Sequence, residues 1–202
     1  MSRIPGVPTK AASRLTRLAY RFARKKYGAV PEPVTVSAHH PGLMWAGAVH
    51  ELMIERAATT LPPAVRDLAV YRTAVQLGCS WCVDFGTMLI KHKGLDIDRL
   101  KHIDEYATSD LFTGEERLAL AYADAMTASP VAVTDEQVAE LETAFGRKGL
   151  LELTYMIAVE NLRGRMNSAL DITDQGFTSG DACLVPVPAD GTRDSLSGLA
   201  QS

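Results

Sequence analysis

Cysteine and long apolar runs are both scarce in this chain, and each shortage excludes a class of protein. Three cysteines among 202 residues are too few for the disulfide framework of a small secreted domain. No apolar run approaches the roughly 18 residues that a membrane-spanning helix needs, and the N-terminus lacks the apolar segment of a secretory signal. We therefore expect a cytoplasmic protein whose few cysteines serve redox or metal chemistry in a reducing compartment.

Acidic residues are missing from residues 1–28, which carry eight basic groups. The chain has 21 basic groups in all, so 13 basic and 24 acidic groups lie beyond residue 28, a net charge of about −11. Residues 9–27 have the spacing of an amphipathic helix with a basic face. Such a face can bind an anionic membrane or nucleic acid, or direct a protein to an organelle, but a solvated, partly ion-paired face is commoner. We expect no nucleic-acid or membrane partner, and a helix that docks on acidic surface.

Strand signals are also lacking, because apolar and polar residues nowhere alternate over more than a few positions. Apolar side chains recur instead at helical spacing. The sequence predicts an all-α fold of about seven to eight helices in one globular domain. The helices are expected at about 9–27, 41–59, 63–77, 80–93, 97–107, 114–128, 135–145 and 149–170.

Local signals fix several of these boundaries. The segments Thr113-Gly-Glu-Glu116 and Thr134-Asp-Glu-Gln137 both match the capping box that starts a helix. Val30-Pro31-Glu32-Pro33 predicts a stiff extended linker, since each proline restricts its own backbone and that of its predecessor.

The composition divides the chain into three parts. A basic helix over 1–28 precedes the helical domain over 29–170. From about residue 171 the chain is rich in Gly, Ser, Asp and Pro. We therefore expect an irregular tail over 171–202 that is disordered near its end.

Residues 78–86, Gly-Cys-Ser-Trp-Cys-Val-Asp-Phe-Gly, contain the pair of groups that can exchange electrons. If a helix begins near Ser80, the α-carbons of Cys79 and Cys82 lie roughly 5 Å apart on one face, a separation that a disulfide accepts. The exposed amides and the dipole at a helix N-terminus favour the thiolate, which is the reactive form of cysteine. The pair can therefore cycle between dithiol and disulfide with little backbone movement.

This CxxC in its helical context resembles the signature of the alkylhydroperoxidase D (AhpD) and carboxymuconolactone decarboxylase superfamily. The family pattern reads Glu, eleven residues, Cys-x-x-Cys, three residues, His. Cys79 and Cys82 match the pair, and Asp84 follows as it does in AhpD. Asp67 falls at the position of the Glu, and Gly86 falls where the His stands. The resemblance covers roughly residues 34–180 and includes a closing segment, Glu160-Asn161-Leu-Arg-Gly-Arg165-Met-Asn167-Ser-Ala-Leu170.

The resemblance implies an AhpD-like helical bundle and a thiol-dependent peroxidase without a cofactor. Cys82 would attack a hydroperoxide and become a sulfenic acid, Cys79 would supply a proton and then condense with it, and an external dithiol would reduce the disulfide. It also implies a homo-oligomer, often a trimer or hexamer. Two alternatives remain open: a carboxymuconolactone-type decarboxylase, which needs no redox pair, and a catalytically silent interaction module.

The departure at Gly86 concerns proton transfer. The family's Glu and His relay protons to the cysteines, whereas Asp67 has a shorter reach than Glu and Gly86 has no side chain. Gly86 lies on the helix face of Cys82 and leaves space there. Our hypothesis is that His39 or His40 fills this space with an imidazole, whose pKa suits proton transfer near neutrality. The alternative is that this His pair only forms the turn and entry of the next helix.

Other residues near the motif are candidates to support the cysteines or contact substrate. Trp81 and Asp84 flank Cys82, although an aromatic at a helix start is as often part of a core or a subunit interface. In the closing helix, Glu160 and Arg165, together with Asn167, either line the thiol site or form a salt-bridged surface.

Metal binding is the rival chemistry, because Cys79, Cys82, His39 and His40 supply the ligand count of a Cys2His2 zinc site. Adjacent histidines do not easily face one ion, and structural zinc usually has two spaced ligand pairs, so we expect no metal. Cys183 lies in the predicted tail, where we expect an ordinary thiol rather than a third redox partner.

Overall fold

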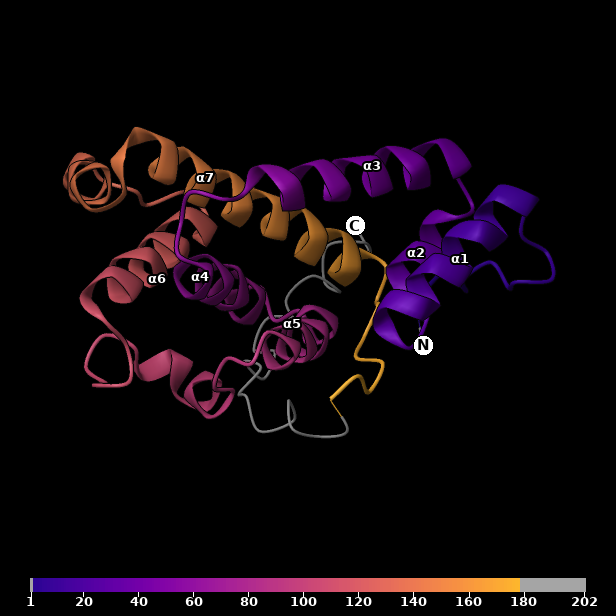
Figure 1. Ribbon diagram of the computed structural model, residues 1–202, viewed down its shortest axis with the longest axis horizontal. Helices are drawn as coiled ribbons and strands as arrows, with labels where there is room; N and C mark the ends of the chain where they lie inside the picture. The colour runs from indigo at the N-terminus through magenta and orange to yellow at the C-terminus, as the bar shows by residue number, and fades with distance from the viewer. Residues whose placement is uncertain (1, 179–202) are drawn as a thin grey trace, which may run out of the picture.

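The computed structural model describes residues 2–178, which form an all-α fold (Figure 1). In chain order the helices are α1 (Arg14–Tyr27), α2 (Glu32–Ser37), α3 (Pro41–Ala57), α4 (Pro63–Gln76), α5 (Ser80–His92), the 3-10 helix η1 (Asp98–Glu105), α6 (Gly114–Thr127) and α7 (Asp135–Ala169). Residues 2–178 contain no β-strand, as predicted. None of the helices in this part of the chain is both long and apolar enough to cross a lipid bilayer.

Both predicted capping boxes are present. Thr113 and Glu116 exchange side-chain and backbone hydrogen bonds at the start of α6, and Thr134 and Gln137 do the same for α7. Within α7, Gly146 has φ 67° and ψ 169°, a conformation open to glycine and strained for other residues. The break separates two helical segments that the sequence predicts as separate helices.

Two local expectations are wrong. Residues 30–33 are not an extended linker, because Pro31 is the N-cap of α2 and Pro33 lies in the first turn of that helix. Proline is tolerated there, since backbone N–H groups in the first turn have no hydrogen-bond acceptor within the helix. The first helix begins at Arg14 rather than near residue 9, because Ser13 accepts a hydrogen bond from the Thr16 amide at 3.1 Å. The helix expected at 97–107 is present over Asp98–Glu105 and is a 3-10 helix.

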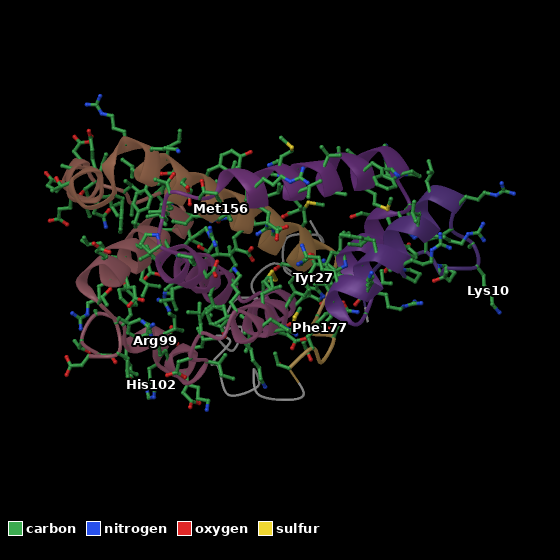
Figure 2. The ribbon with its side chains drawn as sticks, in the orientation of Figure 1. Lys10, Tyr27, Arg99, His102, Met156 and Phe177 are labelled. Atoms are coloured by element: carbon green, nitrogen blue, oxygen red, sulfur yellow. A yellow bond between two sulfur atoms is a disulfide. The ribbon has the colours of Figure 1, made fainter. Side chains whose placement is uncertain are left out.

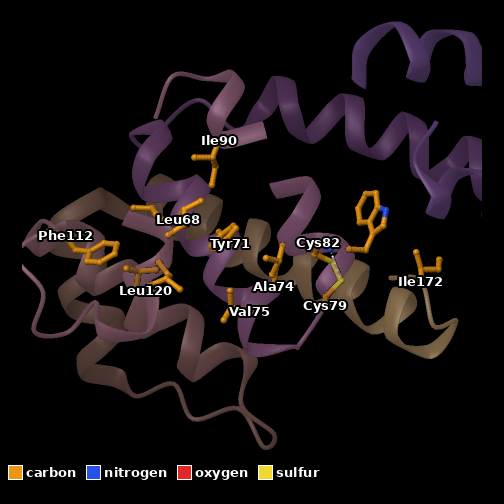
Figure 3. Packing of buried hydrophobic residues seen from close by; sticks show 14 of the residues in the cluster. Leu68, Tyr71, Ala74, Val75, Cys79, Cys82, Ile90, Phe112, Leu120 and Ile172 are labelled. Carbon is orange, nitrogen blue, oxygen red and sulfur yellow. Dashed lines mark hydrogen bonds between the residues drawn. A yellow bond between two sulfur atoms is a disulfide. The ribbon is translucent and has the colours of Figure 1, made fainter. Parts of the chain in front are cut away.

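Helix α4 lies at the centre of the domain, and α5, α6 and α7 pack against it. Apolar side chains fill the interfaces, and one cluster runs from α6 through α4 to the start of α5, where it includes both cysteines (Figure 3). Arg72 of α4 is a buried charged residue beside this core. Its guanidinium bonds to Asp124 of α6 and Asp104 of η1, which compensates its charge and ties η1 to the core.

The N-terminal helices lie to one side of this core. Helix α1 buries Thr16, Tyr20 and Ala23, and the Tyr20 hydroxyl donates to the Val7 carbonyl at 3.0 Å. We expected α1 to dock on an acidic surface. Within residues 2–178, one ion pair joins α1 to another helix, between Lys26 and Glu55 of α3 at 3.1 Å. Other basic side chains of this end, such as Lys10, point into solvent (Figure 2).

Helix α3 runs beside the second half of α7 (Figure 1). It buries few side chains, chiefly Met44 and Ile54, although it is rich in apolar residues. Exposed apolar side chains therefore lie on three helices: Leu15, Leu18 and Phe22 on α1; Leu43, Trp45, Val49, Leu52 and Met53 on α3; Leu151, Tyr155, Leu162 and Met166 on α7.

Candidate redox centre

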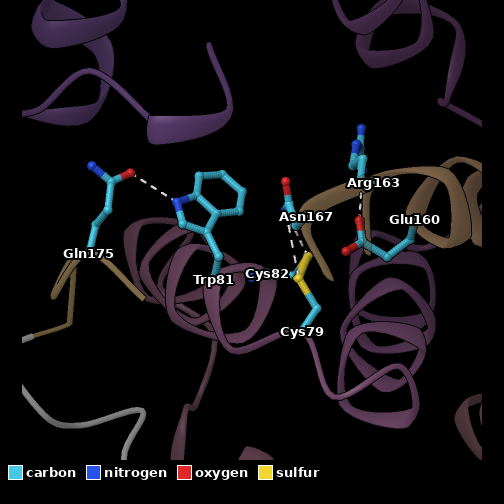
Figure 4. The surroundings of a disulfide bond; sticks show 7 residues. All are labelled: Cys79, Trp81, Cys82, Glu160, Arg163, Asn167 and Gln175. Carbon is cyan, nitrogen blue, oxygen red and sulfur yellow. Dashed lines mark hydrogen bonds and ion pairs between the residues drawn. A yellow bond between two sulfur atoms is a disulfide. The ribbon is translucent and has the colours of Figure 1, made fainter. Parts of the chain in front are cut away.

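Cys79 and Cys82 form a disulfide with their α-carbons 5.2 Å apart, which confirms the separation expected from the sequence. Both residues are buried, with 3% and 6% of their surfaces exposed. The disulfide lies at the junction of α4 and α5 and faces α7 (Figure 4).

The local backbone explains why the sulfur atoms lie at the start of α5. Helix α4 ends at Gln76, Gly78 turns the chain with φ 62°, and Cys79 becomes the N-cap of α5. The Cys79 Sγ accepts a hydrogen bond from the Cys82 amide at 3.2 Å. Both cysteines lie at the N-terminus of α5, where the positive end of the helix dipole favours a thiolate in the reduced centre.

Asn167 brings α7 to the disulfide. Its Nδ2 lies 3.4 Å from the Cys82 Sγ and 3.7 Å from the Cys79 Sγ, both within donor distance. One turn earlier, Gly164 lets α7 approach the turn before α5, because a Cβ there would lie 2.6 Å from the Leu77 Cδ1. The amide can stabilise negative charge on either sulfur.

Glu160 lies two turns before Asn167 on the same face of α7, among the residues around the disulfide (Figure 4). It is 4% exposed, and its carboxylate accepts a hydrogen bond from Arg163 at 3.0 Å. Arg163 also bonds to Glu51 of α3, with 2.9 Å between its Nε and the Glu51 Oε1. Burial raises the pKa of Glu160 from 4.5 to about 7, although Arg163 opposes the change.

A short segment after α7 covers another side of α5. Asp84 is buried, and its carboxylate accepts hydrogen bonds from the amides of Gln175, Phe177 and Thr178 and from the Thr178 hydroxyl, at 2.8 to 3.1 Å. We call residues 171–178 the strap. The Gln175 side chain also accepts a hydrogen bond from the Trp81 indole at 2.9 Å (Figure 4).

Two comparisons by sequence identify the family. The profile of the carboxymuconolactone decarboxylase family matches residues 44–125. The uncharacterized protein YnjA of Escherichia coli K12 is 34% identical over 163 residues, which cover 81% of this chain and 87% of YnjA. The chain belongs to the carboxymuconolactone decarboxylase family. The closed CxxC pair in this family fold fits a redox role.

Solved structures show that this family member has the AhpD-like fold. Apo Bmp8, a debrominase, has a TM-score of 0.79 and 20% identity over 91% of this chain and 97% of Bmp8. A Bmp8 cysteine variant in complex with 2,3,4-tribromopyrrole has the same TM-score at 19% identity, with the same coverage of both chains. An AhpD-core, peroxidase-related protein from Ralstonia eutropha JMP134 has a TM-score of 0.76 and 19% identity over 87% of this chain and 94% of that protein.

Asp67, which falls at the position of the family's Glu, is not brought to the cysteines. Its carboxylate pairs with Arg66 at 3.3 Å and with Lys93 at 2.6 Å. Lys93 is the C-cap of α5, whereas Cys79 is its N-cap, and 13 helical residues span roughly 20 Å. The expected match fails because α4 and α5 are antiparallel, so that the start of α4 meets the end of α5.

The space beside Gly86 is not filled by a histidine. A Cβ on Gly86 would lie 3.3 Å from the ring of Tyr71, a buried residue of α4. The His39 ring is hydrogen-bonded to the Pro5 carbonyl at 2.8 Å, and the His40 Nδ1 accepts from the Leu43 amide at 3.2 Å. Both histidines are exposed, and His40 caps α3, so the structure assigns them to the entry of that helix.

The other candidates divide into two groups. Trp81, Glu160 and Asn167 lie around the disulfide, whereas Arg165 is exposed on a different face of α7 from Asn167. Cys183 lies outside the described residues. Arg163 was not among the residues predicted from the sequence. Its position three residues after Glu160 is a signal for it, because oppositely charged side chains at this helical spacing commonly form an ion pair.

No group of three or more His, Cys, Asp or Glu side chains within residues 2–178 has the arrangement of a metal site. The rival Cys2His2 set is not assembled, because the two sulfurs are bonded to each other and His39 and His40 bond elsewhere.

Proposed function

We propose that this chain is a cytoplasmic dithiol–disulfide oxidoreductase that reduces hydroperoxides with Cys79 and Cys82. The observation that carries the proposal is the disulfide at the N-terminus of α5, where the Cys82 amide and the Asn167 side chain donate to sulfur. These donors stabilise a thiolate and give the centre a reactive reduced state. A reducing cytoplasm would supply the dithiol that regenerates it.

The reaction consumes one hydroperoxide and one external dithiol. In the oxidative half, the Cys82 thiolate attacks the hydroperoxide, the O–O bond breaks, and an alcohol leaves while sulfur becomes a sulfenic acid. Cys79 then displaces the hydroxyl group, so that the disulfide and one water form. In the reductive half, the external dithiol gives two electrons and two protons and becomes a disulfide.

Counting thiols tests the proposal directly. The protein is reduced, freed of reductant and treated with one equivalent of hydroperoxide, in the native form and as Cys82→Ser. Native protein is expected to lose two thiols and to consume peroxide catalytically when dithiol is supplied. An unchanged thiol count in the native protein would contradict the proposal, and decarboxylation of a lactone without thiol loss would favour the lyase alternative.

An aryl halide is a second candidate oxidant. Trp81 stacks on Phe85 with ring centroids 4.7 Å apart, and Phe177 contacts Phe85 edge-on at 5.2 Å. These aromatic side chains adjoin the cysteines and suit a planar substrate. Two thiols and one aryl bromide would give a disulfide, the arene and hydrogen bromide, so release of bromide from a bromopyrrole, measured with the same thiol count, distinguishes this substrate class from hydroperoxides.

We also propose that the protein works as a homo-oligomer, with a trimer or hexamer favoured. The support is the exposed apolar surface on α1, α3 and α7, because soluble monomers rarely leave several apolar helix faces uncovered.

A further inference from the structure

A proton carrier for the cysteines is missing from the positions where the family places it. Formation of the thiolate requires a group that accepts a proton, and the departing oxygen requires a group that returns one. Asp67 pairs with Lys93 at the far end of α5. Gly86 has no side chain, and Tyr71 occupies the space beside it.

Three other polar residues around the disulfide are candidates for the proton carrier, and two of them are unsuitable. Asn167 contacts both sulfurs, but an amide does not titrate. Asp84 directs its carboxylate to the strap, where it accepts bonds from three residues. Glu160 is the buried carboxyl group that remains in the surroundings of the disulfide (Figure 4).

The fold places Glu160 and the disulfide against the same face of α7. Glu160, Gly164 and Asn167 are four and three residues apart, so they form one stripe along the helix. Asn167 contacts the sulfurs, and Gly164 packs on Leu77, two residues before Cys79. Glu160 is therefore a buried residue on the face of α7 that meets the cysteines (Figure 4).

The charges around Glu160 leave both of its protonation states accessible. Arg163 of α7 is its direct partner, and Glu51 of α3 shares that guanidinium and opposes a second negative charge. The turn between α4 and α5 presents Leu77 and the cysteines to the α7 stripe. Burial raises the pKa of Glu160 to about 7 because the shared cation compensates only part of the cost. Near neutral pH the group can both accept and donate a proton.

We propose that Glu160 is the proton acceptor and donor of the dithiol centre. This inference rests on the proposed function. The Glu160 carboxylate accepts the proton of the Cys82 thiol, and the thiolate attacks the hydroperoxide. As the O–O bond breaks, the leaving alkoxide takes that proton from Glu160 and departs as the alcohol. Cys79 then displaces hydroxide from the sulfenic acid, and its own proton completes the water.

The first test follows the cysteines without peroxide. In fully reduced protein, the rate of iodoacetamide alkylation is measured against pH for the native form, Glu160→Gln and Glu152→Gln. Coupling to Glu160 predicts an inflection near pH 7 in the native profile that Glu160→Gln removes. Glu152 is the matched control, since it lies on α7 but accepts from the Thr60 and Leu61 amides. Superimposable profiles for the native form and Glu160→Gln would overturn the assignment.

The second test measures proton transfer during turnover. At pH 7, peroxide-driven disulfide formation in Glu160→Gln is expected to be about a hundredfold slower than in native protein. Glu160→Asp, which keeps a carboxyl group, is expected to recover part of the rate. Equal rates for Glu160→Gln and native protein would contradict the role. If native protein forms no disulfide with peroxide, the proposed function fails, while the alkylation profile still decides the role of Glu160.

A third measurement needs no substitution and covers the case in which Glu160→Gln does not fold. Infrared difference spectra between reduced and oxidised native protein at neutral pH are expected to show a carboxyl group that changes its protonation with the redox state. The absence of such a band would overturn the proposal.

Discussion

At the scale of the residue, the redox centre depends on a glycine, Gly164, whose lack of a side chain lets two helices approach closely. Gly164 lies where α7 crosses the turn between α4 and α5, and a Cβ there would lie 2.6 Å from the Leu77 Cδ1 and 3.4 Å from its Cβ. The close approach lets Asn167, one turn later, reach both sulfurs. Glycine in a helix interior costs about 1 kcal/mol relative to alanine, and this contact explains why it is present here.

Gly164→Ala is therefore expected to lower the free energy of unfolding by about 1 to 3 kcal/mol, since the added methyl group overpacks the junction. The substitution should also weaken the contact of Asn167 with sulfur and slow disulfide reduction and reoxidation. Chemical denaturation and thiol kinetics measure both effects. The control is Gly114→Ala, at an exposed position at the start of α6 where a Cβ meets nothing within 4 Å. Equal stability of the two variants would contradict the packing argument.

The sequence predicts the contact between the two cysteines, but it leaves open whether the candidate residues of α7 reach them. Cys79 and Cys82 were accessible to prediction because their contact depends on spacing within one helical turn. Asn167 lies 85 and 88 residues away from them, so its contact depends on how α7 crosses α5. Asp67 shows the converse: its position in the sequence matches the family pattern, but antiparallel packing places it beside Lys93.

At the scale of the element, the sequence predicts where helices begin but not how the segments pack against one another. The starts of α6 and α7 followed from capping boxes, which are local. The irregular segment after α7 was expected from composition, but its attachment was not, because the four hydrogen bonds on Asp84 join residues more than 90 apart. These bonds hold the strap against the N-terminal half of α5, near the buried disulfide.

Asp84→Asn is expected to loosen the strap, because an amide accepts these amide donors less strongly than a carboxylate does. We expect a loss of about 3 kcal/mol in unfolding free energy and faster reduction of the disulfide by a bulky reductant. Hydrogen exchange of residues 175–178 and the reduction rate provide the measurements. Asp174→Asn makes the same change at an exposed strap residue and should leave both unchanged. If the amides of residues 175–178 exchange as slowly in Asp84→Asn as in native protein, Asp84 does not anchor the strap.

At the scale of the whole molecule, the apolar side chains divide between an inner core and an outer surface. The core around α4 accounts for the fold. The exposed apolar side chains of α1, α3 and α7 lie outside this core. These exposed apolar side chains on three helices support the homo-oligomer that we propose.

Val49→Glu tests this assembly. Val49 is 57% exposed on α3, and burying a carboxylate at an apolar interface is costly. We expect native protein to sediment as an oligomer and Val49→Glu to shift toward the monomer by at least tenfold in the association constant. Val131→Glu, at a 64% exposed site between α6 and α7, is the control and should keep the native mass. A native monomer, or an unchanged mass for Val49→Glu, would contradict assembly through α3.

The contact between Gly86 and Tyr71 limits how the centre can change. A Cβ at position 86 would lie 3.3 Å from the ring of Tyr71, so any side chain there requires this buried ring to shift by a few tenths of an ångström. Whether α5 can accept a proton-relay histidine therefore depends on how far Tyr71 of α4 can move, which couples the two positions.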